Sequence, residues 1–295
     1  MTEPKTLPPS LRIWAQHRVG EIIRVRDASQ PRPNSQVWEL HSTADARHFI
    51  KISPSATFYR RETFAYRHAV PALLRNRAPQ LVDSRAEALA LLLTAVPGSP
   101  VTQLRLVDAG QRAVHCQAGA LYARLHEAGG LDREARSEAE DVLTATANGV
   151  GKHLAAAADR LTAAERELVL CYAVQLRSAG PVPLGFIQGD AQERNWLWES
   201  RSGLAVIDFE RAQFAPLVKD FVILAATAWL EAPALERAFF HGYGRQLTSQ
   251  ERHVLQCLVV LDAVSCLAWG PPHGDDEVTA RGQRTLDRLM RRDHP

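Results

Sequence analysis

Residues 184–211 read LGFIQGDAQERNWLWESRSGLAVIDFER, and the rest of the chain is interpreted from this stretch. Residues 196–200 and 203–207 have the short apolar runs of two strands, and Arg201 and Ser202 between them predict a tight two-residue turn. That turn places Asn195 opposite Asp208, at the separation of about 4.5–5.5 Å between Cα atoms that antiparallel pairs show. An amide oxygen and a carboxylate, both hard donors, would then meet at one end of the hairpin. This is the outline of a magnesium site.

A second carboxylate, Asp190, lies in the loop before the hairpin, five residues ahead of Asn195. Kinases need this division of roles, because one Asp orients the attacking hydroxyl while an Asn and another Asp hold the metal on the phosphates. The alternative interpretation is a polar loop followed by an ordinary hairpin. The spacing D-x-x-x-x-N is common by chance, but its combination with the string IDFE is much rarer and favours phosphoryl transfer.

The D-x-x-x-x-N spacing followed by a hydrophobic residue and D-F resembles the catalytic and metal motifs of the aminoglycoside phosphotransferase family, which are small-molecule kinases with a protein-kinase-like fold. The resemblance covers residues 19–269. It implies a bilobal α+β fold, with a small N-terminal antiparallel sheet lobe that carries one helix and a larger, mostly helical C-terminal lobe. We expect the lobes to span residues 1–97 and 98–295, because the string AVPGS at 95–99 interrupts a hydrophobic strand.

Hydrophobic periodicity supports this division of the chain. Residues 1–10 are rich in proline and are expected to be loose. Strands are expected at 19–27, 36–42, 47–53, 80–84 and 88–95, with one helix at 58–77. Helices are expected at 110–127, 134–161, 217–230, 232–243, 249–269 and 277–291, and another capped by Thr162 that runs to residue 177.

Composition excludes several classes of protein. The chain has 295 residues, 46% of them hydrophobic, and a net charge of +2, which indicates neither a nucleic-acid surface nor a membrane surface and leaves the oligomeric state open. The four cysteines form no CxxC pair and are expected to be buried thiols in a reducing compartment. The N-terminus lacks the features of a secretory signal, and no run approaches the ~18–20 apolar residues of a membrane span, so we expect a cytoplasmic protein.

Lys51 stands inside the apolar string HFIKI, where an ammonium group needs a partner. In kinases a strand lysine grips the nucleotide phosphates and pairs with a glutamate of the next helix, and Glu62 is the only acid in the helix expected here. The alternative is an edge-strand lysine whose ammonium group reaches solvent. The downstream motif favours the nucleotide-binding interpretation.

The rest of the nucleotide site is placed by the resemblance. The string ASQPRPNSQ occupies the position of the phosphate-covering loop but has no glycine, and Asn34 and Ser35 are its candidate phosphate contacts. Residues 91–96, including Ala95 and Val96, resemble the segment whose backbone binds the base. Backbone contacts with the base leave no side-chain signature, so the sequence does not distinguish ATP from GTP as the phosphoryl donor. Mg²⁺ is the expected cofactor.

Four further positions are supporting candidates. The family has histidine two residues before the catalytic Asp, where this chain has Gln188, whose amide could brace the loop; a weakened or inactive kinase is the alternative. Asp220 resembles a second family Asp that braces the catalytic loop, although a role at a helix N-terminus or on the surface is equally compatible. His126 is expected to pack against the catalytic loop, as in relatives. Arg194 could neutralise phosphate charge, or be an ordinary exposed arginine.

The resemblance implies transfer of the γ-phosphoryl group of a nucleoside triphosphate to a hydroxyl of a small molecule, with an antibiotic as the first candidate acceptor. A metabolic kinase for a sugar or amino alcohol and a non-catalytic nucleotide-binding regulator are the alternatives. Glu193, beside Asp190, and the acids Asp275, Asp276 and Glu277 would attract a cationic acceptor. A solvated charge run that caps the last helix is the alternative for those three acids.

Overall fold

The computed structural model describes residues 5–30, 35–43 and 46–293, and the described chain forms two compact units. Unit 1 combines residues 1–105 with residues 188–213, so the stretch that contains Asp190, Asn195 and Asp208 groups with the N-terminal sheet. Unit 2 combines residues 106–187 with residues 214–295.

Unit 1 is built on a five-stranded antiparallel sheet with the strand order β1-β2-β3-β5-β4. One helix follows the third strand, which confirms the expected N-terminal architecture. The strands and that helix are β1 (Ile22–Asp27), β2 (Val37–Ser42), β3 (Arg47–Ile52), α2 (Ala56–Phe64), β4 (Leu81–Arg85) and β5 (Ala90–Thr94).

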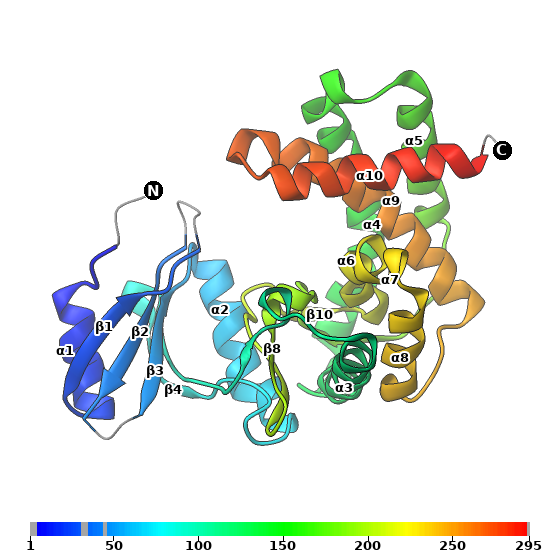
Figure 1. Ribbon diagram of the computed structural model, residues 1–295. Helices are drawn as coiled ribbons and strands as arrows, with labels where there is room; N and C mark the ends of the chain where they lie inside the picture. The colour runs from blue at the N-terminus through cyan, green and yellow to red at the C-terminus, as the bar shows by residue number, and fades with distance from the viewer. Residues whose placement is uncertain (1–4, 31–34, 44–45, 294–295) are drawn as a thin grey trace. The chain divides into compact units, whose positions relative to one another are not determined.

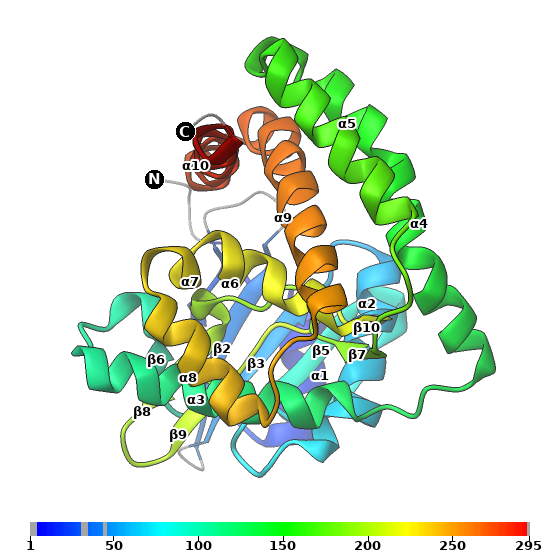
Figure 2. The ribbon, with the colours of Figure 1, turned by 90° about the vertical axis from the view of Figure 1, so that its right-hand side faces the viewer.

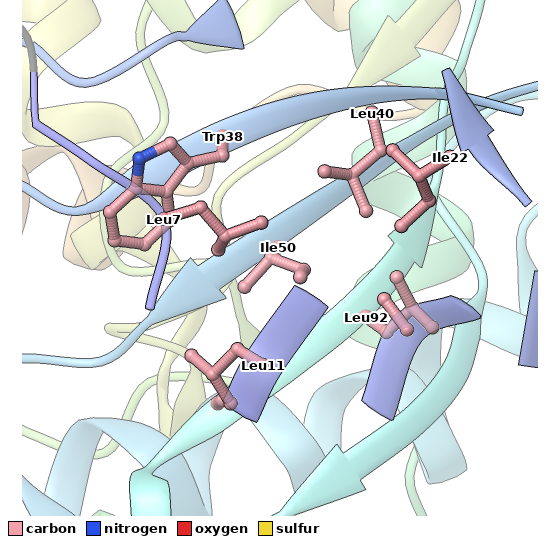
Figure 3. Packing of buried hydrophobic residues seen from close by; sticks show 9 residues of the cluster. Leu7, Leu11, Ile22, Trp38, Leu40, Ile50 and Leu92 are labelled. Carbon is pink, nitrogen blue, oxygen red and sulfur yellow. The ribbon is translucent and has the colours of Figure 1, made fainter. Parts of the chain in front are cut away.

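A helix that the sequence analysis missed, α1 (Pro9–Val19), covers one face of this sheet (Figure 1). Leu7 and Leu11 are buried against Trp38, Leu40 and Ile50 in one hydrophobic cluster (Figure 3). The expectation that residues 1–10 are loose is therefore wrong for the described residues 5–10. Proline at the first helical position is a start signal, because its fixed φ suits a helix and its missing N–H is not needed there.

The opposite face of the sheet carries α2 (Figure 1). Side chains alternate between the two faces of a strand, so Lys51 points away from the cluster that contains Ile50. The helix begins after Ser55, whose hydroxyl accepts a hydrogen bond from the Phe58 amide, and continues as a π-helical turn and a short 3₁₀ turn that ends at Ala72. It stops five residues before the expected end at residue 77, since Pro71 cannot continue a helix.

The rest of unit 1 contains the hairpin. Strand β8 (Trp196–Glu199) pairs with β9 (Gly203–Val206) and with the short β6 (Ser99–Pro100). Arg77 holds the hairpin, because its guanidinium donates to the carbonyls of Ser202 and Leu204 and its own carbonyl accepts from the Val206 amide.

Unit 2 is mostly helical. The long helix α9 packs against α4 and α5 on one side and against α10 on another (Figure 2). Helix α3 packs against α8. The helices are α3 (Asp108–His126), α4 (Arg133–Ala156), α5 (Ala163–Arg177), α6 (Val222–Ala226), α7 (Ala228–Glu231), α8 (Pro233–Tyr243), α9 (Ser249–Trp269) and α10 (Asp276–Asp293). A small sheet pairs β7 (Leu184–Ile187) with β10 (Gln213–Pro216). The α4 helix ends five residues before the expected end at 161, and Thr162 caps α5 as expected, through a capping box with Glu165.

By length and composition α9 could cross a membrane, in contrast to the expectation from the sequence that no run is apolar over the length of a span. More than half of its most apolar window, 56%, is buried inside the protein. The core helix of a globular unit has the same properties, so this single helix is weak evidence for a membrane span.

Candidate active site

The register of the β8–β9 hairpin differs from the prediction by one residue. Trp196 pairs with Val206 and Glu199 with Gly203, so three residues, not two, form the connection. Gly203 has φ of +78°, the left-handed conformation that closes three-residue hairpin loops. Asn195 is therefore opposite Ile207, whose amide donates to the Asn195 carbonyl at 3.0 Å, and Asp208 is the next residue along the chain.

Asp208 has φ of +66°, one of three described non-glycine residues with positive φ. This left-handed residue ends the extended run after β9. Its carboxylate contacts Lys51, with 2.6 Å between Oδ1 and Nζ. The two residues are 157 positions apart in the sequence, and the hairpin and strand β3 bring them together within unit 1.

Lys51 has two further carboxylate partners. Its Nζ lies 3.1 Å from Glu62 Oε1, so the predicted contact between Lys51 and Glu62 is formed, and 3.0 Å from Glu210 Oε2. Glu210 was not predicted from the sequence, although the string IDFE places it two residues after Asp208. The Glu62 side chain is completely buried, whereas those of Asp208 and Glu210 are 33% and 24% exposed. One cation therefore faces three acids, two of which can be reached from solvent.

Burial and charge act against each other in this cluster. Burial raises the pKa of Glu62 to about 7, despite the attraction of Lys51, and Glu62 Oε2 has no hydrogen-bond partner among the described residues. Burial alone would lower the pKa of Lys51, but Asp208, Glu62 and Glu210 hold it well above its ordinary value. Burial would raise the pKa of Asp208, but Lys51 outweighs it and the pKa is lowered. Lys51 and Asp208 are therefore a charged pair at neutral pH.

Asp190 is held by three side chains of its own loop. Its Oδ1 accepts from Gln192 at 2.7 Å, and its Oδ2 accepts from the Asn195 amide at 2.8 Å and from Arg194 at 3.1 Å. The Asn195 amide also donates to the Asp190 carbonyl at 2.9 Å. Glu193 begins the single helical turn Glu193–Asn195, which carries Arg194 and Asn195. The loop thus fixes both the carboxylate and the orientation of the Asn195 side chain.

The donor set fits a magnesium ion. The Asn195 nitrogen is used on Asp190, which leaves its Oδ1 for a cation, and no described donor contacts that oxygen. With Asp208 and Glu210 it supplies hard oxygen ligands around a cluster with excess negative charge. The described residues contain no group of three or more His, Cys, Asp or Glu side chains arranged to hold a metal. A magnesium site completed by phosphate oxygens and water needs no such group, because one or two protein ligands suffice.

Gln188 is completely buried and joins the two loops that carry the acids. Its amide donates to the carbonyls of Ile207 at 2.6 Å and Asp208 at 3.2 Å. Gly189 follows with φ of +78°, and a Cβ there would collide with the Arg211 carbonyl. The Gln188 amide therefore connects the loop that carries Asp190 to the segment that carries Asp208.

The remaining predicted nucleotide contacts are Asn34, Ser35, Ala95 and Val96. Asn34 lies outside the described residues. The Ser35 hydroxyl accepts from the Gln30 amide at 2.9 Å. The Ala95 amide donates to the Arg47 carbonyl at 3.1 Å, so the Ala95 carbonyl and the backbone of Val96 stay the predicted contacts of the base.

In unit 2, Asp220 is buried, and its Oδ2 lies 3.1 Å from His126 Nε2. The other ring nitrogen of His126 lies 2.8 Å from the Tyr243 hydroxyl. Burial in this network excludes the surface interpretation of Asp220. That Asp220 and His126 support the catalytic loop stays a prediction.

An antiparallel sheet that carries a buried Lys–Glu pair, followed by D-x-x-x-x-N and a lysine-bound Asp, defines the class of protein-kinase-like phosphotransferases. The chain belongs to the phosphotransferase enzyme family, whose model matches residues 33–258.

Solved structures share the fold. The apo form of a thermostable mutant of aminoglycoside phosphotransferase APH(4)-Ia has a TM-score of 0.72 and 16% identity, covering 96% of this chain and 99% of that one. The GDP and kanamycin complex of APH(2")-IIia gives 0.68 and 16%, covering 95% and 97%. Macrolide 2'-phosphotransferase MphH from Brachybacterium faecium gives 0.59 and 16%, covering 94% and 96%. A search of curated proteins found no match.

Proposed function

We propose that this protein is a magnesium-dependent kinase that moves the γ-phosphoryl group of ATP or GTP to a hydroxyl of a small molecule in the cytoplasm. The observation that carries the proposal is the cluster in which Lys51 contacts Glu62, Asp208 and Glu210, with the Asp190–Asn195 pair on the same unit. Removing an ammonium group and its three acids from water costs free energy. An ordinary surface hairpin would not require such a cluster, so its presence supports a role in binding phosphate.

Each residue has a proposed role. Asp190, oriented by Gln192 and Arg194, accepts the proton of the acceptor hydroxyl and aims its oxygen at the phosphorus. Lys51 holds donor phosphate oxygens, and Glu62 keeps its ammonium group in place. Asn195 and Asp208 are the residues that would hold Mg²⁺, which neutralises phosphate charge when bound. Catalysis is then mostly positioning and charge stabilisation.

An antibiotic is the acceptor we propose first. Among the solved structures of similar fold are complexes of aminoglycoside phosphotransferases with kanamycin and with hygromycin B, and a macrolide phosphotransferase. Each of these antibiotics is named for the similar protein and not for this chain. They support hydroxylated natural products as the class to test, with sugars and amino alcohols as the metabolic alternative.

A two-stage experiment tests the function. Melting temperatures are first measured with ATP or GTP, each with and without Mg²⁺, and with the Asp208→Asn variant as the control. A nucleotide that raises the melting temperature only with Mg²⁺ and only in the wild type is then used to screen hydroxylated antibiotics and metabolites for phosphorylated products. Binding without any turnover would favour a nucleotide-binding regulator, and absence of nucleotide binding would contradict the proposal.

A further inference from the structure

A cavity of about 580 Å³ opens in unit 2 where three parts of the chain meet. They are the end of α3 with the loop that follows it, the start of β7 and the end of α8, and the two helices lie side by side (Figure 1). The volume is within the range of roughly 300–1,000 Å³ that is usual for small-molecule sites. The cavity borders the start of β7, whereas Asp190 follows the end of that strand, so it is a candidate site apart from phosphoryl transfer.

Much of the wall is apolar. Its apolar side chains come from all three parts of the chain except the end of α8, and they are Ala123, Ala128, Leu131, Pro183, Leu184 and Leu217. Such a wall favours the apolar body of a ligand, because contact with it removes apolar surface from water.

The polar pair in the wall is satisfied inside the protein. The Tyr243 hydroxyl lies 2.8 Å from His126 Nδ1, and His126 Nε2 lies 3.1 Å from Asp220 Oδ2. A carboxylate only accepts, so Nε2 of the neutral ring carries the hydrogen and Nδ1 accepts from the tyrosine. Both side chains therefore add shape to the cavity, and the charge at its rim must come from other residues.

Two charged residues line the cavity, and only one of them is neutralised. The Arg245 guanidinium donates to both carboxylate oxygens of Glu251, at 2.7 and 2.8 Å, and lies 5.4 Å from the centre of the Tyr243 ring. The Glu127 carboxylate is exposed and forms no ion pair or hydrogen bond with the described residues. Helices α3 and α8 end at His126 and Tyr243, and helix C-termini carry partial negative charge. The balance at the cavity is negative.

The alternative is a crevice filled only with water where three elements diverge. A smaller cavity, of about 330 Å³ at the end of α4, illustrates such a place, because its charged lining residues Asp159 and Arg160 have opposite signs. A crevice without selectivity would bind a cation and a neutral molecule of the same shape equally. A negative rim on an apolar wall predicts a preference for the cation instead.

We propose that this cavity is a binding site for a small organic cation. The apolar body of the ligand packs against Leu131, Leu184 and Leu217, and its ammonium group pairs with the Glu127 carboxylate. The site is additional to the proposed kinase function and does not depend on it.

Three probes of similar shape test the site in the nucleotide-free protein: 2-phenylethylammonium, 2-phenylethanol and 3-phenylpropionate. NMR titration of leucine methyl groups locates binding, and the signals of Leu131, Leu184 and Leu217 are expected to shift most. We expect the ammonium probe to bind about 2- to 5-fold more tightly than the alcohol, the range for one exposed ion pair, and the carboxylate probe to bind most weakly. Glu127→Gln should raise the ammonium Kd to that of the alcohol and leave the alcohol Kd unchanged.

A second variant tests the cavity independently of charge. Ala128→Phe should fill it and abolish binding of both the ammonium probe and the alcohol, whereas Ala145→Phe adds the same ring to an exposed position of α4 as the control. Glu138→Gln on α4 is the control for Glu127→Gln and should bind like the wild type.

Equal Kd values for the ammonium probe and the alcohol in the wild type would overturn the proposal. So would an ammonium Kd that responds to Asp276→Asn/Glu277→Gln and not to Glu127→Gln, because the probe would then be bound near the acids considered for the acceptor. Because no nucleotide is present, none of these results bears on the proposed kinase function, whose own failure is the absence of nucleotide binding.

Discussion

Asp190 and Asp208 have different neighbours, and their asparagine variants should fail in different ways. Asp190→Asn is expected to reduce kcat by about 10²–10⁴-fold while Mg–nucleotide affinity stays within about 3-fold, since the lost group acts on the acceptor. Asp208→Asn should abolish metal-dependent nucleotide binding, because Asp208 is the proposed metal carboxylate. Single-turnover rates and nucleotide titrations measure both. Equal losses of nucleotide affinity in the two variants would contradict the assigned roles.

Lys51 has two functions that its variants should reveal together. Lys51→Ala removes the proposed phosphate grip and leaves Glu62, Asp208 and Glu210 without their cation. We expect nucleotide affinity and rate to fall, and the free energy of unfolding without ligand to fall by about 3–5 kcal/mol, as for other broken buried pairs. Glu62→Ala should impair both more mildly. Steady-state kinetics of Lys51→Ala equal to the wild type would show that Lys51 is structural only.

Glu62 should make the ligand-free protein less stable as pH rises. Its folded pKa of about 7 exceeds its ordinary value of 4.5, so the folded state binds more protons between these values. The free energy of unfolding is therefore expected to fall between pH 4.5 and 7, by on the order of 1–3 kcal/mol, and to level off above. Glu62→Gln should remove this slope in denaturant titrations, whereas Glu138→Gln, an exposed acid, should keep it. A slope unchanged in Glu62→Gln would refute the raised pKa.

The sequence predicted some of these residues and missed others for identifiable reasons. A lysine inside an apolar strand needs an acid, and the next helix offered only Glu62, so that contact could be predicted. Glu210 carried a signal too, but nothing in IDFE says that its side chain turns back towards Lys51. Asp208, two residues earlier, has a left-handed φ of +66°, and the backbone conformation of a single non-glycine residue cannot be inferred from sequence composition.

At the scale of elements, strand and helix positions followed from periodicity, whereas ends and register did not. One left-handed glycine, Gly203, lengthened the hairpin connection by a residue and moved the partner of Asn195 from Asp208 to Ile207. A two-residue and a three-residue loop are both compatible with the string SRSG. The helix α1 was missed because its prolines at positions 8 and 9 suggested a loose segment, although a helix can begin at a proline.

The contact between α3 and α8 depends on two glycines. A Cβ at Gly119 would collide with the Phe239 carbonyl, and one at Gly242 with the Cys116 carbonyl, so each helix offers the other a gap. Ala at either position should reduce the free energy of unfolding by about 1–3 kcal/mol through overpacking. Denaturant titration measures this.

Glycines of α4 provide the matched control. A Cβ at Gly149 or Gly151 would meet nothing within 4 Å, so Ala there should stabilise the helix by about 0.5–1 kcal/mol. Equal effects of Ala in α4 and in the α3–α8 contact would show that the close approach of α3 and α8 has no energetic weight.

At the scale of the whole molecule, the short chain after Asp208 limits the acceptor. Strand β10 begins at Gln213 and a helical turn follows at Leu217–Phe221. Protein kinases use an activation segment of some tens of residues after this Asp to bind a peptide, and no such length exists here. The acceptor is therefore expected to be a small molecule, and its charge is the next property to establish.

The acids near α10 have at least one structural role, which changes how their function must be tested. Asp275 caps the helix, because its Oδ1 accepts from the Val278 amide at 3.1 Å, and the capping interpretation holds for this residue. Replacing it would weaken α10 and confuse the result. Asp276 and Glu277 stand in the first helical turn, where acids also favour the helix dipole, but each contributes only a few tenths of a kcal/mol at an exposed site.

A cationic acceptor should respond to Asp276→Asn/Glu277→Gln with Asp275 kept. We expect its KM to rise about 2- to 5-fold without a change in kcat, because attraction at a distance acts on encounter and not on the phosphoryl transfer step. Raising the salt concentration should increase the wild-type KM similarly and affect the double variant less, since screening removes the same attraction. Glu138→Gln/Glu140→Gln on α4 removes equal charge as the control. If KM changes neither in the Asp276→Asn/Glu277→Gln variant nor with salt concentration, the hypothesis of a cationic acceptor is rejected. The proposal of a small-molecule kinase would still stand.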